Sequence, residues 1–299
     1  MSARSARANA ALALAGAIAV SACGRGEGPS TASFTKPAPT VARLYQGLSP
    51  EAWAARLSDA DPAARYEATV ALAALDAAKE EGRAGLLRCL SDPSASVRFG
   101  ALDALGRVAD PDATLVLAAL GRLDDEGDGV RRHAKAVAAR WGALSLPALR
   151  ARIAAKDERT RRDALEVLAA LGADAAPAAA DLALLVVGDD VAAQDDAAQA
   201  LAAMGAAGVP ALALALDDPR ADTAVIAASA LARVGPAAAP AVPALARALR
   251  RRGAVRSASA DALVAVGEPA REALVAAAAD SDEGVREAAK DALDRLPAK

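Results

Sequence analysis

Apolar positions recur with a helical period inside a longer repeat of 30 to 33 residues. The clearest copy spans residues 92–108. With Arg98 as the reference, the residues three, seven and ten positions later are Ala101, Leu105 and Val108, and these offsets share one face of an α-helix. The pattern therefore predicts a helix with one buried face. Eight copies are found, with references Arg65, Arg98, Arg131, Arg161, Gln194, Ala224, Arg256 and Arg286.

Two further positions of the repeat indicate how such helices pack and end. The offset-three residue is small in every copy, which predicts a close approach between helices. A glycine follows eleven positions after the reference in five copies, and glycine there predicts a helix stop in the left-handed conformation. The small residues are Ala68, Ala101, Ala134, Ala164, Ala197, Ala227, Ser259 and Ala289. The glycines are Gly142, Gly172, Gly205, Gly235 and Gly267.

The other half of each repeat predicts a shorter helix. Residues 147–153, 210–216 and 243–249 each begin with proline, which is tolerated in the first turn of a helix. Acidic turns such as residues 59–62 and 91–93 lie between the two helices, and their Asp and Ser side chains can cap the second one. Composition agrees: hydrophobic residues make up 54% of the chain but aromatic residues only 2%, whereas sheets favour Val, Ile and aromatic residues. We expect an all-α chain.

This repeat resembles the HEAT repeat in its short bacterial form, the phycobilisome-lyase HEAT-like repeat. A turn Asp, then Val-Arg, then Ala three residues on and Ala-Leu carry the resemblance, most clearly at residues 97–105 and 285–293. It covers residues 49 to 297 and implies a right-handed α-solenoid of about eight two-helix repeats. It also implies that the recurring Arg pairs with a turn Asp of its own or a neighbouring repeat, rather than binding an anion. Gln194 and Ala224 depart from this pattern.

The amino terminus predicts export. Residues 1–22 carry Arg4 and Arg7 and no acidic residue, and residues 10–20 form an apolar run typical of a signal peptide. The run ends at Val-Ser-Ala before Cys23, which resembles the bacterial lipobox; simple secretion is the alternative. We expect a lipoprotein signal peptide over 1–22, a flexible tether over 23–45 with lipidated Cys23, and a repeat domain over 46–299. Gly24, not Asp, follows the cysteine and favours the outer membrane, facing the periplasm.

Little in the chain predicts chemistry. The net charge is −3 and the pI about 5.4, which disfavours nucleic-acid binding because phosphate contacts need a basic surface. Cys89 is predicted to be a buried small hydrophobe and the single histidine, His133, to be exposed. Acidic pairs such as residues 189–190 and 217–218 are predicted to be caps and solvated surface. We expect no catalytic residue, no metal site and no cofactor.

The predicted function is a non-catalytic, protein-binding scaffold tethered to a membrane of the bacterial cell envelope. A bilin-lyase-like enzyme or enzyme-accessory subunit on the same repeats is the alternative. In such solenoids the second helices line the concave surface, and the residue after each reference position points away from the buried face. Tyr66, Phe99, Arg132 and Arg162 are the predicted partner-binding patch, because aromatic residues and Arg are enriched at binding hot spots. The alternative is that the tether, through Phe34, covers Tyr66 and Phe99.

Overall fold

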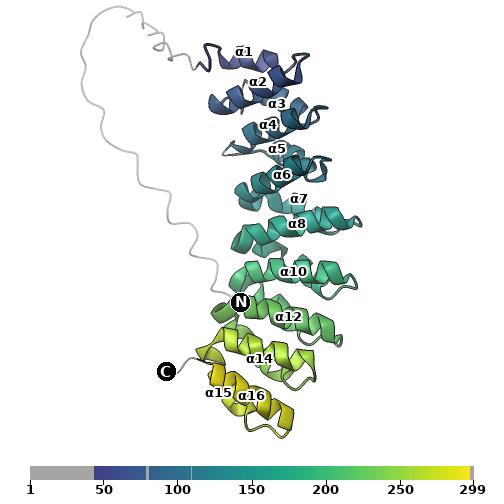
Figure 1. Cartoon of the computed structure of the whole chain (residues 1–299), viewed down its shortest axis with the longest axis vertical. Coiled ribbons are helices and arrows are strands. Elements are labelled where there is room, and N and C mark those ends of the chain that lie inside the picture. The colour runs from purple at the N-terminus through teal and green to yellow at the C-terminus, as the bar shows by residue number, and fades with distance from the viewer. Residues whose placement is uncertain (1–43, 79–80, 109, 297–299) are drawn as a thin grey trace, which may run out of the picture. The chain divides into compact units, whose positions relative to one another are not determined.

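The computed structural model of the chain describes residues 44–78, 81–108 and 110–296, and these form eight successive pairs of α-helices (Figure 1). The first helices of the pairs are α1 (Pro50–Arg56), α3 (Arg83–Cys89), α5 (Ala113–Leu120), α7 (Leu146–Ile153), α9 (Ala179–Val186), α11 (Val209–Ala215), α13 (Val242–Ala248) and α15 (Arg271–Ala277). The second helices are α2 (Pro62–Ala74), α4 (Ala95–Gly106), α6 (Asp128–Arg140), α8 (Glu158–Leu171), α10 (Val191–Ala203), α12 (Ala221–Val234), α14 (Ala254–Val266) and α16 (Glu283–Arg295).

Each second helix packs against the first helix of its own pair and, except for the last one, α16, against the second helix of the next pair. Within the described ranges there is no β-strand, only an isolated bridge between Tyr45 and Leu48. Short 3-10 helices join several successive pairs: η2 (Gly142–Ser145), η3 (Gly172–Ala178), η4 (Gly205–Ala207), η5 (Gly235–Ala241) and η6 (Glu268–Ala270). A further one, η1 (Gly121–Asp124), follows α5. The predicted all-α solenoid of eight two-helix repeats is confirmed.

The small-residue row lies at the centre of this packing. All eight offset-three residues are buried, with at most 1% of the surface of any of them exposed. The row therefore marks helix contacts, as predicted, because a larger side chain would hold the backbones apart. Cys89 is likewise buried, as predicted, and burial raises the pKa of its thiol.

The five predicted glycine stops are confirmed, with one difference in conformation. Their φ angles lie between +56° and +82°. At Gly172, Gly235 and Gly267 the ψ angles are −127°, −137° and −140°, far from the left-handed helical value of about +47°. This region of backbone space is open essentially to glycine alone. These glycines thus do more than end a helix: they redirect the chain into the next pair.

Two stretches, Glu158–Val186 and Ala221–Ala248, are long and apolar enough to cross a membrane by length and composition. In the structure each consists of a second helix, a 3-10 helix and the first helix of the following pair, divided at Gly172 or Gly235. Many of their apolar side chains pack within the stack of helix pairs, although Leu184 is 72% exposed. These stretches are therefore elements of the repeat core.

In four repeats the recurring arginine joins its pair to the following one. Arg65 donates from Nε and Nη2 to both carboxylate oxygens of Asp92, at 2.7 and 2.9 Å, and from Nη1 to the carbonyls of Asp59 and Ala60 in its own turn. Arg98 repeats the arrangement one pair later: it donates twice to Asp125, at 2.8 Å each, and to the carbonyls of its own turn. Arg161 pairs with Asp190, and Arg256 with Asp282. The predicted pairing with a turn Asp is confirmed for these four.

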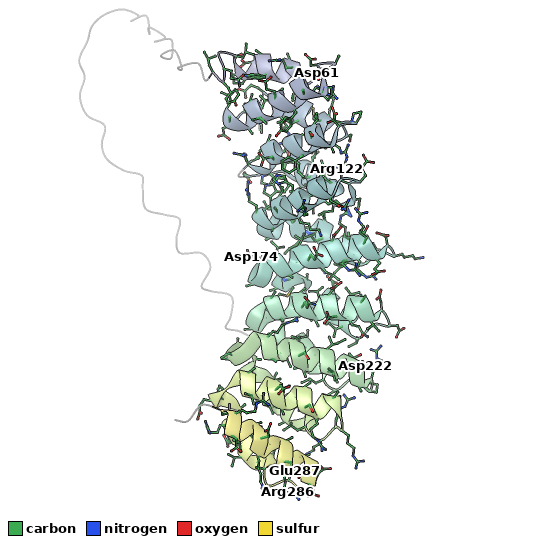
Figure 2. All side chains as sticks on the ribbon, viewed as in Figure 1. Asp61, Arg122, Asp174, Asp222, Arg286 and Glu287 are labelled. Atoms are coloured by element: carbon green, nitrogen blue, oxygen red, sulfur yellow. The ribbon has the colours of Figure 1, made fainter. Side chains whose placement is uncertain are left out.

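The turn aspartates bind the backbone as well as the arginine. Asp92 and Asp125 accept from the N–H of Ser94 and Gly127, each at 2.9 Å. Asp190 and Asp282 cap α10 and α16. Figure 2 shows Asp61, Arg122 and Asp222 along the edge of the stack where these turns lie, with Asp174 on the opposite edge. Each carboxylate thus orders its own turn and holds the preceding pair.

A second set of arginines, which the sequence analysis did not identify, points the opposite way along the chain. Arg122, Arg152, Arg220 and Arg251 donate to the carbonyls of Leu90, Leu120, Val187 and Leu216, at distances of 2.7 to 2.9 Å. These carbonyls end first helices of preceding pairs. A guanidinium there satisfies a free carbonyl and complements the negative end of the helix dipole. The two sets complement each other: together they supply an arginine contact at each of the seven junctions between pairs, and only the junction of the second and third pairs has both.

Removing the carboxylate of Asp125 should strongly destabilise the fold. The Arg98 and Asp125 side chains are only 6% and 2% exposed. Burial alone would raise the pKa of Asp125, but hydrogen bonds from Arg98 and Gly127 and the charges of Arg98 and Arg122 outweigh it and hold that pKa below its ordinary value. We expect Asp125→Ala to lower the free energy of unfolding by about 3–5 kcal/mol, because the substitution leaves the buried Arg98 guanidinium without its carboxylate partner. Urea denaturation monitored by circular dichroism measures this.

Asp217→Ala is the matched control, because Asp217 pairs with Arg247 where both side chains are more than half exposed. Its expected cost is at most about 1 kcal/mol. Equal costs for the two variants would contradict a dominant role of the buried pair.

Candidate functional site

The candidate site lies on an exposed ridge formed by the second helices. We define the ridge as the residues one position after each reference: Tyr66, Phe99, Arg132, Arg162, Asp195, Val225, Ser257 and Glu287. All are exposed except Val225, which is half-buried. The predicted orientation of this row, away from the buried face, is confirmed. Its amino-terminal members are aromatic and basic, so the ridge differs in chemistry from one end to the other.

Tyr66 and Phe99 come together although they lie on different helices. They remain 39% and 37% exposed and share the walls of a cavity of about 380 Å³, completed by Ala95, Ser96, Gly127, Gly129 and Val130. We call this cavity the aromatic groove. A smaller hollow of about 150 Å³ lies against the same two rings, between α2 and α4. Two aromatic side chains thus stand at the surface with space around them, in a chain that has few aromatic residues.

Glycines shape this groove. Helices α2 and α4 approach so closely that a Cβ at Gly100 would lie 2.1 Å from Thr69 Oγ1 and 3.0 Å from the Tyr66 ring. Thr69 Oγ1 in turn donates to the carbonyl of Tyr66 at 2.6 Å. At Gly129, by contrast, an added Cβ would meet nothing within 4 Å. One glycine therefore lets the two helices approach, and the other leaves the groove open.

The prediction that His133 is exposed is wrong: the residue is half-buried, and its ring packs beside that of Phe99. Its ring centroid lies 4.5 Å from that of Phe99, with the planes inclined at 38°. Its Nε2 is buried and makes no hydrogen bond of good geometry, although Asp103 Oδ1 is 3.3 Å away. Burial lowers the pKa of His133; Arg140 and Arg107 lower it further, and Asp103 only partly offsets this. The prediction failed because it considered the face of one helix and not the aromatic ring on the next.

The two arginines of the predicted patch differ in their surroundings. Arg132 is exposed on α6 and makes no hydrogen bond or ion pair with the other described residues. Arg162 forms an ion pair with Glu158 on its own helix and another with Asp196 on α10, at 3.5 Å. Neither arginine lines the groove. The structure thus joins Tyr66 and Phe99, places an unpaired charge on the adjacent helix, and leaves Arg162 largely neutralised.

The other candidate positions give a simpler picture. Asp190 caps α10 and binds Arg161, and Asp218 pairs with Arg220. Across the described ranges no group of three or more His, Cys, Asp or Glu side chains could hold a metal ion. Cys23 and Phe34 lie outside the described residues.

Sequence reasoning missed part of the groove. Its floor comes from Gly127, Gly129 and Val130, with Gly127 at the N-cap of α6 and Gly129 in the first turn of that helix. The signal was present: of the eight second helices, only α6 begins with the run Gly-Asp-Gly. From the sequence of one repeat this run could not be recognised as part of a groove, because the two rings that complete the groove come from other repeats.

These features define a class of protein: an α-solenoid of two-helix repeats with a recessed aromatic site on its second helices. Residues 50–140, which contain the first three helix pairs and the whole groove, match the family described as HEAT repeats. No curated protein sequence matches the chain.

Solved structures similar to the chain include human deoxyhypusine hydroxylase in complex with glycerol, at 23% identity and a TM-score of 0.35, covering 82% of this chain and 95% of that one. Another is the Kap95:Nup1 complex, at 13% identity and a TM-score of 0.46, covering 82% of this chain and 40% of that one. These likenesses concern the fold alone.

The lowered pKa of His133 predicts a pH-dependent stability. Because the unfolded state binds a proton near pH 6.5 and the folded state only at lower pH, the free energy of unfolding should fall as the pH drops through 6.5. His133 is the chain's single histidine, so His133→Gln should remove most of the change between pH 7.5 and 5.5. Urea denaturation at the two pH values measures it, and an unchanged pH dependence in the variant would contradict the assignment.

Proposed function

We propose that the chain is a non-catalytic protein-binding scaffold, tethered to a membrane of the bacterial cell envelope, and that the aromatic groove is its docking site. The observation that carries the proposal is the pair of half-exposed rings, Tyr66 and Phe99, around an open cavity. Aromatic side chains are usually buried where they serve only stability, and exposed aromatic residues in pockets are typical of binding hot spots.

The rest of the stack supports a scaffold. Each recurring Arg is held by turn carbonyls, and four of them by a turn aspartate of the next repeat as well. All are therefore engaged in contacts within the stack, and four of them join repeats. A rigid array of repeats presents an extended surface to a partner without further rearrangement.

Site-specific photo-crosslinking in cells tests the docking site. A photoreactive amino acid at Ser96, an exposed residue of the groove, should yield a discrete crosslink to another protein. The same amino acid at Leu214, 75% exposed on a first helix, is the matched control and should not yield that product. The double variant Tyr66→Ala, Phe99→Ala should abolish the product while helicity by circular dichroism is retained.

Two outcomes would count against this docking site. A product that survives the double variant would place the partner elsewhere. Crosslinks only to residues 23–45 of the same chain would favour a tether that covers the rings.

The membrane tether is supported by the position of Cys23 after the apolar run of residues 10–20. Mass spectrometry of the mature protein should show an amino-terminal Cys23 with its lipid and without residues 1–22, in the outer-membrane fraction. Cys23→Ser should release the protein from the membrane or leave it uncleaved. An unmodified Cys23 in the soluble envelope fraction of the wild type would instead support simple secretion.

A further inference from the structure

We propose that the aromatic groove and helix α6 together bind an acidic linear peptide segment, with a large apolar side chain seated in the groove and a carboxylate on Arg132. This inference rests on the proposed docking function and specifies the chemistry of its partner.

The groove supplies the apolar half of this recognition. The rings of Tyr66 and Phe99, Val130 and Ala95 line it, together with the backbone at Gly127 and Gly129. No lining residue carries a charge, and the polar side-chain groups among them are the hydroxyls of Tyr66 and Ser96. An aromatic or large aliphatic side chain would replace water there and stack against the two rings.

The charge beside the groove supplies the other half. Helix α6 carries four basic residues against one acidic residue, a net charge of +3 with His133 neutral, in a chain of net charge −3. Arg131 is held by turn carbonyls and Asp128, Lys135 by Asp163 and Glu166, and Arg140 donates to the carbonyl of Gly106. Among the described residues, Arg132 makes no such interaction. A single guanidinium is therefore left for a partner.

The position of Arg132 on α6 also suits a contact with a peptide that occupies the groove. It lies three residues after Gly129, which lines the groove, and residues three apart share one face of a helix. The carboxylates around the groove are already paired: Asp128 with Arg131, Asp103 with Arg107, and Glu67 with Arg56. A basic peptide would find no unpaired carboxylate there, whereas an acidic peptide could form an ion pair with the unpaired guanidinium of Arg132.

The helix spacing sets an approximate register. Packed helices lie about 8–10 Å apart, and an extended chain advances about 3.3 Å per residue. A segment with its anchor between the rings on α2 and α4 therefore reaches α6 with a residue about three positions away. The expected motif is an aromatic or large aliphatic residue with Asp or Glu about three positions along the chain.

Fluorescence anisotropy with short synthetic peptides tests this on the detergent-solubilised full chain. The first probe carries one phenylalanine and, from three positions later, a run of aspartates. The second replaces the aspartates with lysines, and the third replaces the phenylalanine with serine. The first should bind at least about tenfold more tightly than either of the others, and its affinity should fall as salt is raised.

Two substitutions separate the contributions of charge and cavity. Arg132→Glu should weaken the first probe at least about tenfold and strengthen the second. Gly129→Leu should block the groove without disturbing the core, because an added Cβ meets nothing within 4 Å. Gly121→Leu is its matched control, since Gly121 has equally open surroundings outside the groove and should leave binding unchanged.

Binding of the lysine probe as tight as that of the aspartate probe would overturn the proposal, as would an unchanged affinity in Arg132→Glu. Failure here is distinguishable from failure of the proposed function. A crosslinked partner at Ser96 without binding of the acidic probe would retain the docking site and reject its acidic chemistry.

Discussion

The fork of the recurring arginine is the interaction on which the stack depends. One nitrogen of its guanidinium binds the carbonyls of its own turn, while in four repeats the other donors reach the aspartate of the next turn. A guanidinium is suited to this because its donors lie in a rigid plane and it stays charged. At Arg98 the pair with Asp125 is almost fully buried. Burial of two charges offsets much of their attraction, but removing one partner of such a pair is costly because it leaves the other charge buried and uncompensated.

The stack tolerates the loss of this fork in its middle. Gln194 replaces the arginine with an amide that donates to the carbonyl of Gly188 at 2.6 Å and lies 3.5 Å from Thr223 Oγ1. Ala224, the next reference residue, is fully buried and brings no polar group. Here Arg220 and Arg251 bind backbone carbonyls of preceding turns. The second set of arginines therefore holds the two junctions at which the recurring arginine is replaced.

The aromatic groove arises where the repeat departs from its own pattern. Most second helices begin after a turn with Asp, Ser or Arg at the N-cap, but α6 has Gly127 there and Gly129 in its first turn. The missing side chains leave a recess opposite Tyr66 and Phe99, whose own positions are set by close helix packing at Gly100. The same helix holds the largest excess of positive charge among the second helices. A local irregularity on a regular scaffold thus carries both the shape and the charge of the candidate site.

The sequence by itself determined the repeat: the eight helix pairs, the buried small-residue row, the glycine stops and the outward direction of the ridge all follow from local periodicity. These features are local because a helix places residues three, seven and ten apart on one face whatever surrounds it. The tertiary structure decided what lies between repeats. It set His133 against Phe99, paired Arg162 with Asp196, left Arg132 without a partner, and opened the groove beside Gly129. Residues about 33 positions apart become neighbours only through the spacing and rotation of successive pairs, and no periodicity within one helix contains that information.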